Sequence, residues 1–396
     1  MARAEPNATQ ERELGIIESA LLWNWLLSRQ GLAASTRFSS VVDISNATLG
    51  LHAARLPSPY TTVVARGKPP HLATHLFAAD TRAHLITVRC MRKTLHTLPL
   101  KLATAAHAAT RHFRERDAQR AITRAGQDMS TISATIEAIT TMLGDDNLHH
   151  RTIETRLASP HRPVMVIRLA LKLAWERGIL TYINDTACWN KEHRTFAVTA
   201  HRYPELDTTV DRHTATRELI TTYFDRYGPA TINDAMWWSG LSRTAVLTAM
   251  HEASDEWIRL HTPWSTSPAY MSQSRWEEFA DDPHTDTGRT GLNFLAHEDV
   301  AFKAYYETRS RYLGSLPAGQ AFNQIGEVLP TIVWDGHVVG TWSWQPDKTV
   351  TYSLTGQTTP HQRNTIADHA TTITDALRLG WSSTPHRLTD AQLTLL

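Results

Sequence analysis

Helices followed by pairs of short strands recur along this chain, and this repeated order restricts its fold more than any other feature. Apolar residues at helical spacing predict four long helices, over residues 13–30, 100–124, 164–177 and 213–227. Short runs of strand-like composition lie between them, at residues 84–90, 179–184 and 195–199. Helices that lead into a short hairpin are typical of winged-helix modules. We therefore expect an α+β fold that contains tandem winged-helix modules.

The clearest module contains the segment PATINDAMWWSGLSRTAVLTAM, residues 229–250. Thr231 is suited to cap a helix over residues 232–239. Gly240 provides a tight turn, and Ser242 is suited to cap a second helix. Two helices joined in this way form a helix–turn–helix, which proteins place in a DNA groove or use only as a scaffold. The motif alone therefore leaves sequence-specific DNA recognition open.

The predicted secondary structure changes after about residue 290, where strands become more frequent than helices. Residues 331–344 form two alternating runs around Asp335-Gly336, a strong signal for a tight hairpin. A third strand is expected over residues 349–354 and a helix over residues 360–377. These elements predict a small C-terminal β-barrel.

The expected boundaries divide the chain into four domains, with a linker or loop at residues 281–290. They are a first winged-helix module at residues 12–128, a second at 129–210, a third with the helix–turn–helix at 211–280, and the β-barrel at 291–396.

Charge is distributed unevenly along the chain. The whole sequence has 40 Lys and Arg against 39 Asp and Glu, a net charge of +1. Residues 1–125 contain 17 basic and 8 acidic side chains, a net charge of +9. This asymmetry points to a polyanionic partner such as DNA, although arginine-rich helices can also be simply solvated.

Other classes of protein are disfavoured. Two cysteines cannot build a disulfide framework or a four-thiolate zinc site. His71 and His75 are spaced i, i+4 but lack a third ligand, and no phosphate-binding glycine motif is present, so we expect no metal and no organic cofactor. The N-terminus is polar and no apolar run is long enough to span a bilayer, which indicates a reduced, cytoplasmic protein without membrane association.

Two segments in the basic part of the chain combine histidine with arginine or lysine. In LGLHAARLPSPYTTVVAR, residues 49–66, a helix is expected to carry His52 and Arg55 on one face and to end at Pro57. His52 is either a partly buried structural histidine or a functional one. The segment MRKTLH offers Arg92, Lys93 and His96 as either phosphate contacts or a solvated turn.

Five segments together carry a family resemblance: LHAARLPSPYTTVVAR, MRKTLHTLP, YFDRYGPATINDAMWWSGLS, HEDVAFKAYYETRSRYL and VWDGHVVGTWSW. Over about residues 20–380 the chain resembles the bacterial winged-helix DNA glycosylases of the azinomycin-resistance (AlkZ-like) and YcaQ-like group. The resemblance implies tandem winged-helix modules and a C-terminal β-barrel that form a concave DNA-binding scaffold. It also implies removal of bulky N7-alkylguanine adducts and unhooking of interstrand crosslinks.

The chain departs from this family at the catalytic motif. The family has Gln-x-Gln or Gln-x-Asp on a helix, and the matching residues here are His52, Ala53 and Ala54. The resemblance thus makes His52 the residue that positions or deprotonates the attacking water, without the usual polar partner. His297, Glu298 and Asp299 are the next catalytic candidates.

The expected function is a monofunctional, monomeric glycosylase that acts on double-stranded DNA with N7-alkylated purines. The candidate DNA contacts are Arg55, Arg66, Arg92, Lys93, His96 and, on the helix–turn–helix, Arg243. One alternative is a catalytically lapsed protein that only binds DNA or a genotoxin. A transcription regulator is the other, although Arg243 is the only cation that the second helix of the motif offers for reading bases.

Overall fold

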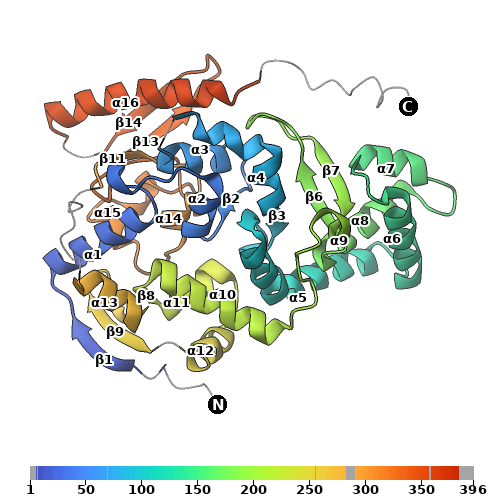
Figure 1. Cartoon of the computed structure of the whole chain (residues 1–396), viewed down its shortest axis with the longest axis horizontal. Coiled ribbons are helices and arrows are strands. Elements are labelled where there is room, and N and C mark those ends of the chain that lie inside the picture. Colours follow the sequence, from blue (N-terminus) through green and yellow to red (C-terminus); the bar gives the residue numbers. More distant parts are fainter. Residues whose placement is uncertain are drawn as a thin grey trace.

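The chain passes three times through one order of elements in this computed structural model (Figure 1). Each passage contains a helix, a two-residue strand, two further helices and a two-stranded hairpin. The structure describes residues 6, 8–68, 70–254, 256–281, 290–355 and 358–382. In every passage the two-residue strand pairs with the second strand of the hairpin, so three sheets share one topology. We call these passages the first, second and third units.

The first unit consists of α2 (Val41–Ala47), β2 (Leu51–His52), α3 (Pro57–Arg66), α4 (Ala79–His84), β3 (Leu85–Arg89) and β4 (Leu95–Pro99), with 3-10 turns at Ala34–Thr36, Pro70–Phe77 and Met91–Lys93. The second unit consists of α6 (Met129–Leu143), β5 (Leu148–His149), α7 (His150–Leu157), α8 (Val164–Arg177), β6 (Leu180–Asn184) and β7 (Arg194–Val198). The third unit consists of α10 (Arg212–Tyr227), β8 (Ala230–Thr231), α11 (Ile232–Ser239), α12 (Arg243–His251), β9 (Trp257–Thr262) and β10 (Ser265–Ser272). The connecting helices are α5 (Leu100–Arg124) and α9 (Thr199–Arg202), and α13 (Gln273–Asp281) follows the third unit.

The predicted pair of helices at residues 229–250 is confirmed. Thr231 begins α11 in a capping box, because its hydroxyl accepts from the Asp234 N–H at 3.0 Å while the Asp234 carboxylate accepts from the Thr231 N–H at 3.1 Å. Gly240 ends α11 at φ +76°, a left-handed conformation that favours glycine. Ser242 then accepts from the Ala245 N–H and caps α12.

The helix expected over residues 49–55 is wrong. Leu49 and Gly50 both have positive φ, which ends α2, and the chain then runs extended as β2. Pro57 begins α3 instead of ending a helix, because its fixed φ and missing N–H suit the first turn. The interpretation that His52 and Arg55 share a helical face therefore fails.

The N-terminal segment joins two distant parts of the chain. Strand β1 (Ala8–Glu13) adds to the third unit's sheet in parallel with β9. In α1 (Ile16–Arg29), the Trp23 indole donates to the Gly336 carbonyl oxygen of the C-terminal hairpin at 2.9 Å. The first expected domain, residues 12–128, is thus in contact with the last.

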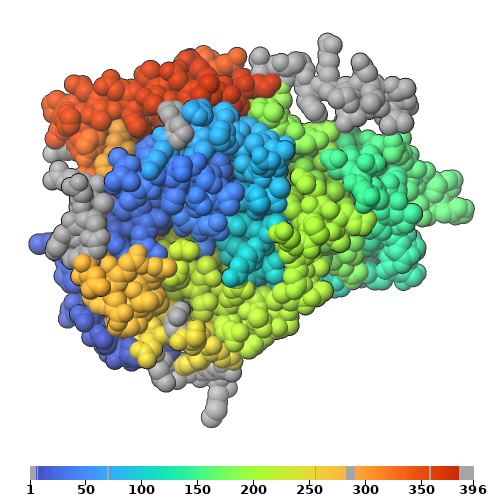
Figure 2. All heavy atoms as spheres, viewed as in Figure 1, coloured from blue at the N-terminus to red at the C-terminus, as the bar shows by residue number. Residues whose placement is uncertain are grey.

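The C-terminal β-barrel is not found in the described part of the chain. Strands β11 (Leu292–Phe294), β12 (Thr331–Trp334), β13 (His337–Trp344) and β14 (Val350–Leu354) form a sheet in that order, with β11 and β14 as its edges. Four strands are too few to close a barrel, and α16 (Pro360–Leu379) packs on the sheet instead. Figure 2 shows α16, in red, lying along the blue first unit, with the green second unit at one end of the molecule. The predicted hairpin at Asp335-Gly336 is confirmed, whereas most of the expected linker, residues 282–289, lies outside the described residues.

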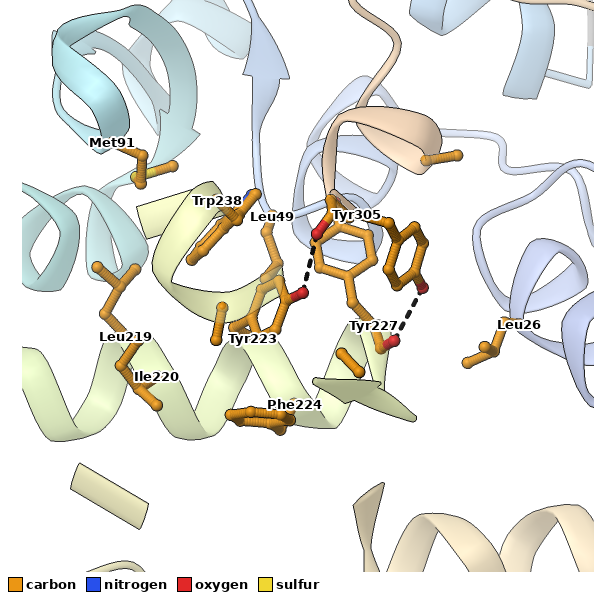
Figure 3. Packing of buried hydrophobic residues seen from close by; sticks show 14 of the residues in the cluster. Leu26, Leu49, Met91, Leu219, Ile220, Tyr223, Phe224, Tyr227, Trp238 and Tyr305 are labelled. Carbon is orange, nitrogen blue, oxygen red and sulfur yellow. Dashed lines mark hydrogen bonds between the residues drawn. The ribbon is translucent and has the colours of Figure 1, made fainter. Parts of the chain in front are cut away.

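A large aromatic core fixes the segment between β11 and β12, which contains α14 (Val300–Lys303), α15 (Ser310–Leu313) and the 3-10 turn Ala318–Gln320. The Tyr223 hydroxyl on α10 donates to the Ala304 carbonyl oxygen at 2.8 Å. The Tyr305 hydroxyl donates to the Tyr227 carbonyl oxygen, also at 2.8 Å (Figure 3). These buried bonds hold α14 and the residues after it against the third unit.

Across the residues described, no helix combines the length and the apolar character needed to cross a bilayer.

Candidate active site and DNA-facing surface

His52 lies opposite His96 in a small antiparallel sheet. Strand β2 places His52 directly across from His96 of β4, and the two rings meet edge to face with centroids 5.3 Å apart. The His52 side chain is buried, with 2% of its surface exposed. Within the described residues neither of its ring nitrogens has a hydrogen-bond partner. Buried polar groups are usually hydrogen-bonded, and the two unpaired nitrogens leave His52 able to bind a further polar group.

Both histidines are neutral at pH 7. Burial lowers the pKa of His52 well below 6.5, and the positive charge of Lys303 and Arg92 acts in the same direction. Burial likewise lowers the pKa of His96 to about 3. An isolated imidazole would lose its acceptor function below about pH 6.5. In this protein His52 keeps that function to a much lower pH.

Lys303 and Glu298 form an ion pair beside the two histidines. Lys303 on α14 contacts the Glu298 carboxylate, and that carboxylate also accepts from the Val328 N–H at 2.7 Å. Both side chains are at least 92% buried, at 8% and 7% exposure. Burial lowers the pKa of Lys303 to about 7, and nearby Arg92 contributes to the shift. The sequence offers Glu298 as a further catalytic candidate, but no spacing rule marks Lys303 as its partner.

We call His52, His96, Glu298 and Lys303 the catalytic cluster, and Arg55 and His297 form its outer edge. The Arg55 guanidinium, with 55% of its side chain exposed, bonds to Glu327 at 2.9 Å. The same carboxylate lies 3.5 Å from the Nε2 atom of His297. The Ser58 hydroxyl donates to the His297 carbonyl oxygen at 2.8 Å and so joins α3 to this edge. Arg55 is therefore in a place where DNA phosphate can reach it.

Two of the predicted DNA contacts, Arg66 and His96, are buried. Arg66 and Asp299 have no exposed side-chain surface and form a bidentate ion pair with distances of 2.7 and 2.9 Å. His96 has 3% exposure and an uncharged ring. Phosphate cannot reach Arg66 in this arrangement, and a neutral, buried His96 offers it no cation, so we assign both to the interior. Asp299, one of the further catalytic candidates, is engaged in this ion pair.

The remaining predicted contacts lie at the surface or partly exposed. Lys93 is 41% exposed and pairs with Asp117 of α5. Arg243 is exposed in the first turn of α12. Arg92 is half-buried, with its guanidinium 3.6 Å from the centroid of the Trp237 ring.

A row of arginines on α5 extends the positive surface beyond Lys93. The row consists of Arg116, Arg120 and Arg124, which are spaced i, i+4 and i+8 and are all exposed. With Lys172 of α8 they line an open groove, and Arg120 also contacts Asp117, the partner of Lys93. We call Arg116, Arg120 and Arg124 the arginine row. The sequence shows an arginine-rich helix, and the four-residue spacing could have identified this face, but it was not among the predicted contacts.

No group of three or more His, Cys, Asp or Glu side chains in the described ranges is arranged to hold a metal ion.

Comparisons with known proteins identify the family and the fold of this chain. The family model for AlkZ-like DNA glycosylases matches residues 46–376. Among solved structures, the DNA glycosylase AlkZ of Streptomyces sahachiroi superposes with a TM-score of 0.73 at 21% identity, over 92% of this chain and 98% of that one. No curated protein sequence matches. Because the family model covers most of the sequence, the chain belongs to the AlkZ-like DNA glycosylase family.

Proposed function

We propose that this protein hydrolyses the N-glycosidic bond of bulky N7-alkylated purines in double-stranded DNA, and that crosslinks are among its substrates. The observation that carries the proposal is His52, a buried, neutral imidazole with two unpaired nitrogens beside an ion pair. We interpret the three units as winged-helix modules that lie within the expected domains 12–128, 129–210 and 211–280. The protein is proposed to be a monomer that acts on DNA in the cytoplasm.

The chemistry of the substrate suits a weak base. N7-alkylation makes the purine cationic, so it departs without being protonated. The transition state then resembles an oxocarbenium ion, and the attacking water needs orientation more than early deprotonation. A group with a pKa well below 6.5 accepts a full proton poorly, but at pH 7 it is entirely in the form that accepts a hydrogen bond. We therefore assign His52 the role of orienting the water.

The proposed DNA path runs over the basic surface of the first unit and α5. Arg55, Arg92, Lys93 and the arginine row are its phosphate contacts, with Arg243 on the third unit. Such contacts are independent of sequence, as a repair enzyme needs, and they weaken steeply as salt rises.

The direct test uses purified wild-type protein and duplex DNA with a single N7-alkylguanine. Released base and abasic sites are measured with enzyme in excess over several hours. Release supports the proposal.

A catalytically lapsed DNA-binding protein is the second candidate. The observation that favours it is the Ala53-Ala54 pair, which offers no polar side chain beside His52. Binding to alkylated DNA without any release would select this candidate over the enzyme.

A further inference from the structure

An exposed tyrosine follows α14 and stacks on the helix–turn–helix. Tyr306 has 50% of its surface exposed. Its ring lies 4.7 Å from that of Trp237 on α11, with 30° between the ring planes. Tyr306 belongs to the segment HEDVAFKAYYETRSRYL, to which the proposed reaction gives no role beyond Glu298 and Lys303.

Two arginines complete the stack without covering the outer face of Tyr306. Arg92 lies 3.6 Å from the Trp237 centroid. Rings whose centroids are 4.7 Å apart leave no room for a guanidinium between them, so Arg92 covers the other face of Trp237. Arg309 lies 4.9 Å from the Tyr306 centroid and 5.5 Å from that of Trp237, so it lies beside both rings and not beyond Tyr306. Neither arginine stands on the outer face of Tyr306, and half of this residue is exposed, so its ring is accessible to a partner. We call these four residues the aromatic stack.

Hydrogen bonds within the protein hold the turn that carries Tyr306 before any partner binds. Asp234, which is fully buried on α11, accepts from the backbone N–H groups of Tyr306 and Glu307, both at 2.7 Å. It also accepts from the Thr308 hydroxyl at 2.8 Å. Glu307 in turn accepts from the Thr231 hydroxyl at 2.7 Å. An exposed ring on such a rigid turn loses little conformational entropy when it binds a partner.

The aromatic stack adjoins the proposed catalytic cluster. Arg92 belongs to both, because its charge acts on His52 and Lys303 while its guanidinium covers Trp237. Tyr306 also follows Lys303 by only three residues in the sequence.

We infer that the outer face of Tyr306 stacks on an uncharged, unpaired nucleobase of DNA opened at the lesion. This inference rests on the proposed function and identifies which base is held. An aromatic face binds any base, and a rigid ring is suited to replace a missing neighbour in the duplex stack. The N7-alkylated purine is itself cationic, and Arg92 and Arg309 already place two positive charges on these rings. The neutral partner or neighbour of the lesion therefore suits the site better than the lesion.

The test compares two DNA duplexes of equal length, one fully paired and one with a single unpaired 2-aminopurine. Affinity is measured for both, and the 2-aminopurine fluorescence reports stacking. Wild-type protein is expected to prefer the unpaired base and to quench its fluorescence. Tyr306→Ala should lose about 5- to 100-fold of that preference and the quenching, while Tyr306→Phe retains both. Tyr352→Ala, a change at a tyrosine exposed on β14, serves as the matched control and should behave as wild type.

The outcomes separate the inference from the proposed function. DNA binding without preference for the unpaired base, or a preference that Tyr306→Ala leaves intact, overturns the inference alone. Wild-type protein that binds neither duplex contradicts the proposed function and the inference together. Unchanged affinity of Tyr306→Ala for the fully paired duplex shows that this variant is folded.

Discussion

The buried pair of Arg66 and Asp299 gives the sharpest prediction about stability. Arg66 is a predicted phosphate contact, but its guanidinium is fully buried against the Asp299 carboxylate. Arg66→Met keeps an unbranched apolar stem and removes the charged guanidinium. We therefore expect a loss of folding stability and no direct effect on DNA binding.

The magnitude follows from what the substitution leaves behind. Among the described residues, the buried Asp299 carboxylate would then accept only from the Ala301 N–H, at 3.0 Å from its Oδ1 atom. Breaking a buried pair in this way costs about 3–5 kcal/mol of unfolding free energy. With an unfolding entropy of about 2.1 cal/mol/K per residue over 396 residues, this corresponds to a fall of about 4–6 °C in the thermal midpoint. Adding Asp299→Asn removes the uncompensated charge and should restore part of the loss.

The assay combines thermal unfolding with DNA affinity measured well below the midpoint. Arg243→Met removes an exposed arginine and is the matched control for stability. Its unfolding free energy should stay within about 0.5 kcal/mol of the wild-type value. An Arg66→Met protein with a wild-type midpoint and weakened DNA binding would refute the reasoning and restore Arg66 to the DNA surface.

Three further predictions follow from the same structure. Replacing the arginine row with alanine should weaken binding to all DNA sequences about equally and reduce the salt slope by about 0.9 for each phosphate that is no longer neutralised, as measured by fluorescence anisotropy; a loss confined to some sequences would argue for a regulator. Gly336→Val forces a β-branched residue to φ +79° and places its Cβ 2.8 Å from the Trp23 indole nitrogen, so the unfolding free energy should fall by about 2–4 kcal/mol, and an unchanged thermal midpoint would contradict the turn geometry. His96 and His107 have a pKa of about 3 when folded and about 6.5 when unfolded, so the unfolded state binds more protons below pH 6.5. Each should therefore cost about 2 kcal/mol of stability at pH 5 relative to pH 7.5, and a flat profile of thermal midpoint against pH would show that these rings are not held neutral.

Local signals predicted the regular elements well. The bounds of α5, α8 and α11 agree with the expected ranges because apolar periodicity, caps and glycine turns act within each element. The Asp335-Gly336 turn was predictable for the same reason, since positive φ at the glycine is a local requirement.

Features that depend on partners distant in the sequence were predicted wrongly or not at all. The segment around His52 was expected to be helical because its composition allows a helix, but Leu49 and Gly50 turn the chain and pairing with β4 extends it. Arg66 was assigned to the surface because its partner Asp299 lies 233 residues away in the sequence. Lys303 was missed because only the fold brings α14 beside β2. The prediction of a closed barrel was wrong because the number of strands and the pairing of the edge strands depend on the whole sheet, which no local pattern reports.

The central claim is that His52 orients the attacking water as a neutral acceptor. The most direct measurement is single-turnover release of N7-alkylguanine from duplex DNA by wild type, His52→Ala and His52→Gln, at pH values from 5 to 8. We expect release by wild type with a rate that does not fall as the pH drops through about 6.5, because burial lowers the pKa of His52 well below that value. His52→Ala should lose release by about 100-fold or more while retaining its affinity for undamaged DNA, and His52→Gln, a neutral acceptor, should retain part of the rate. Release that survives His52→Ala undiminished would contradict the claim and place the water-orienting group elsewhere in the cluster, at His297 or Glu298.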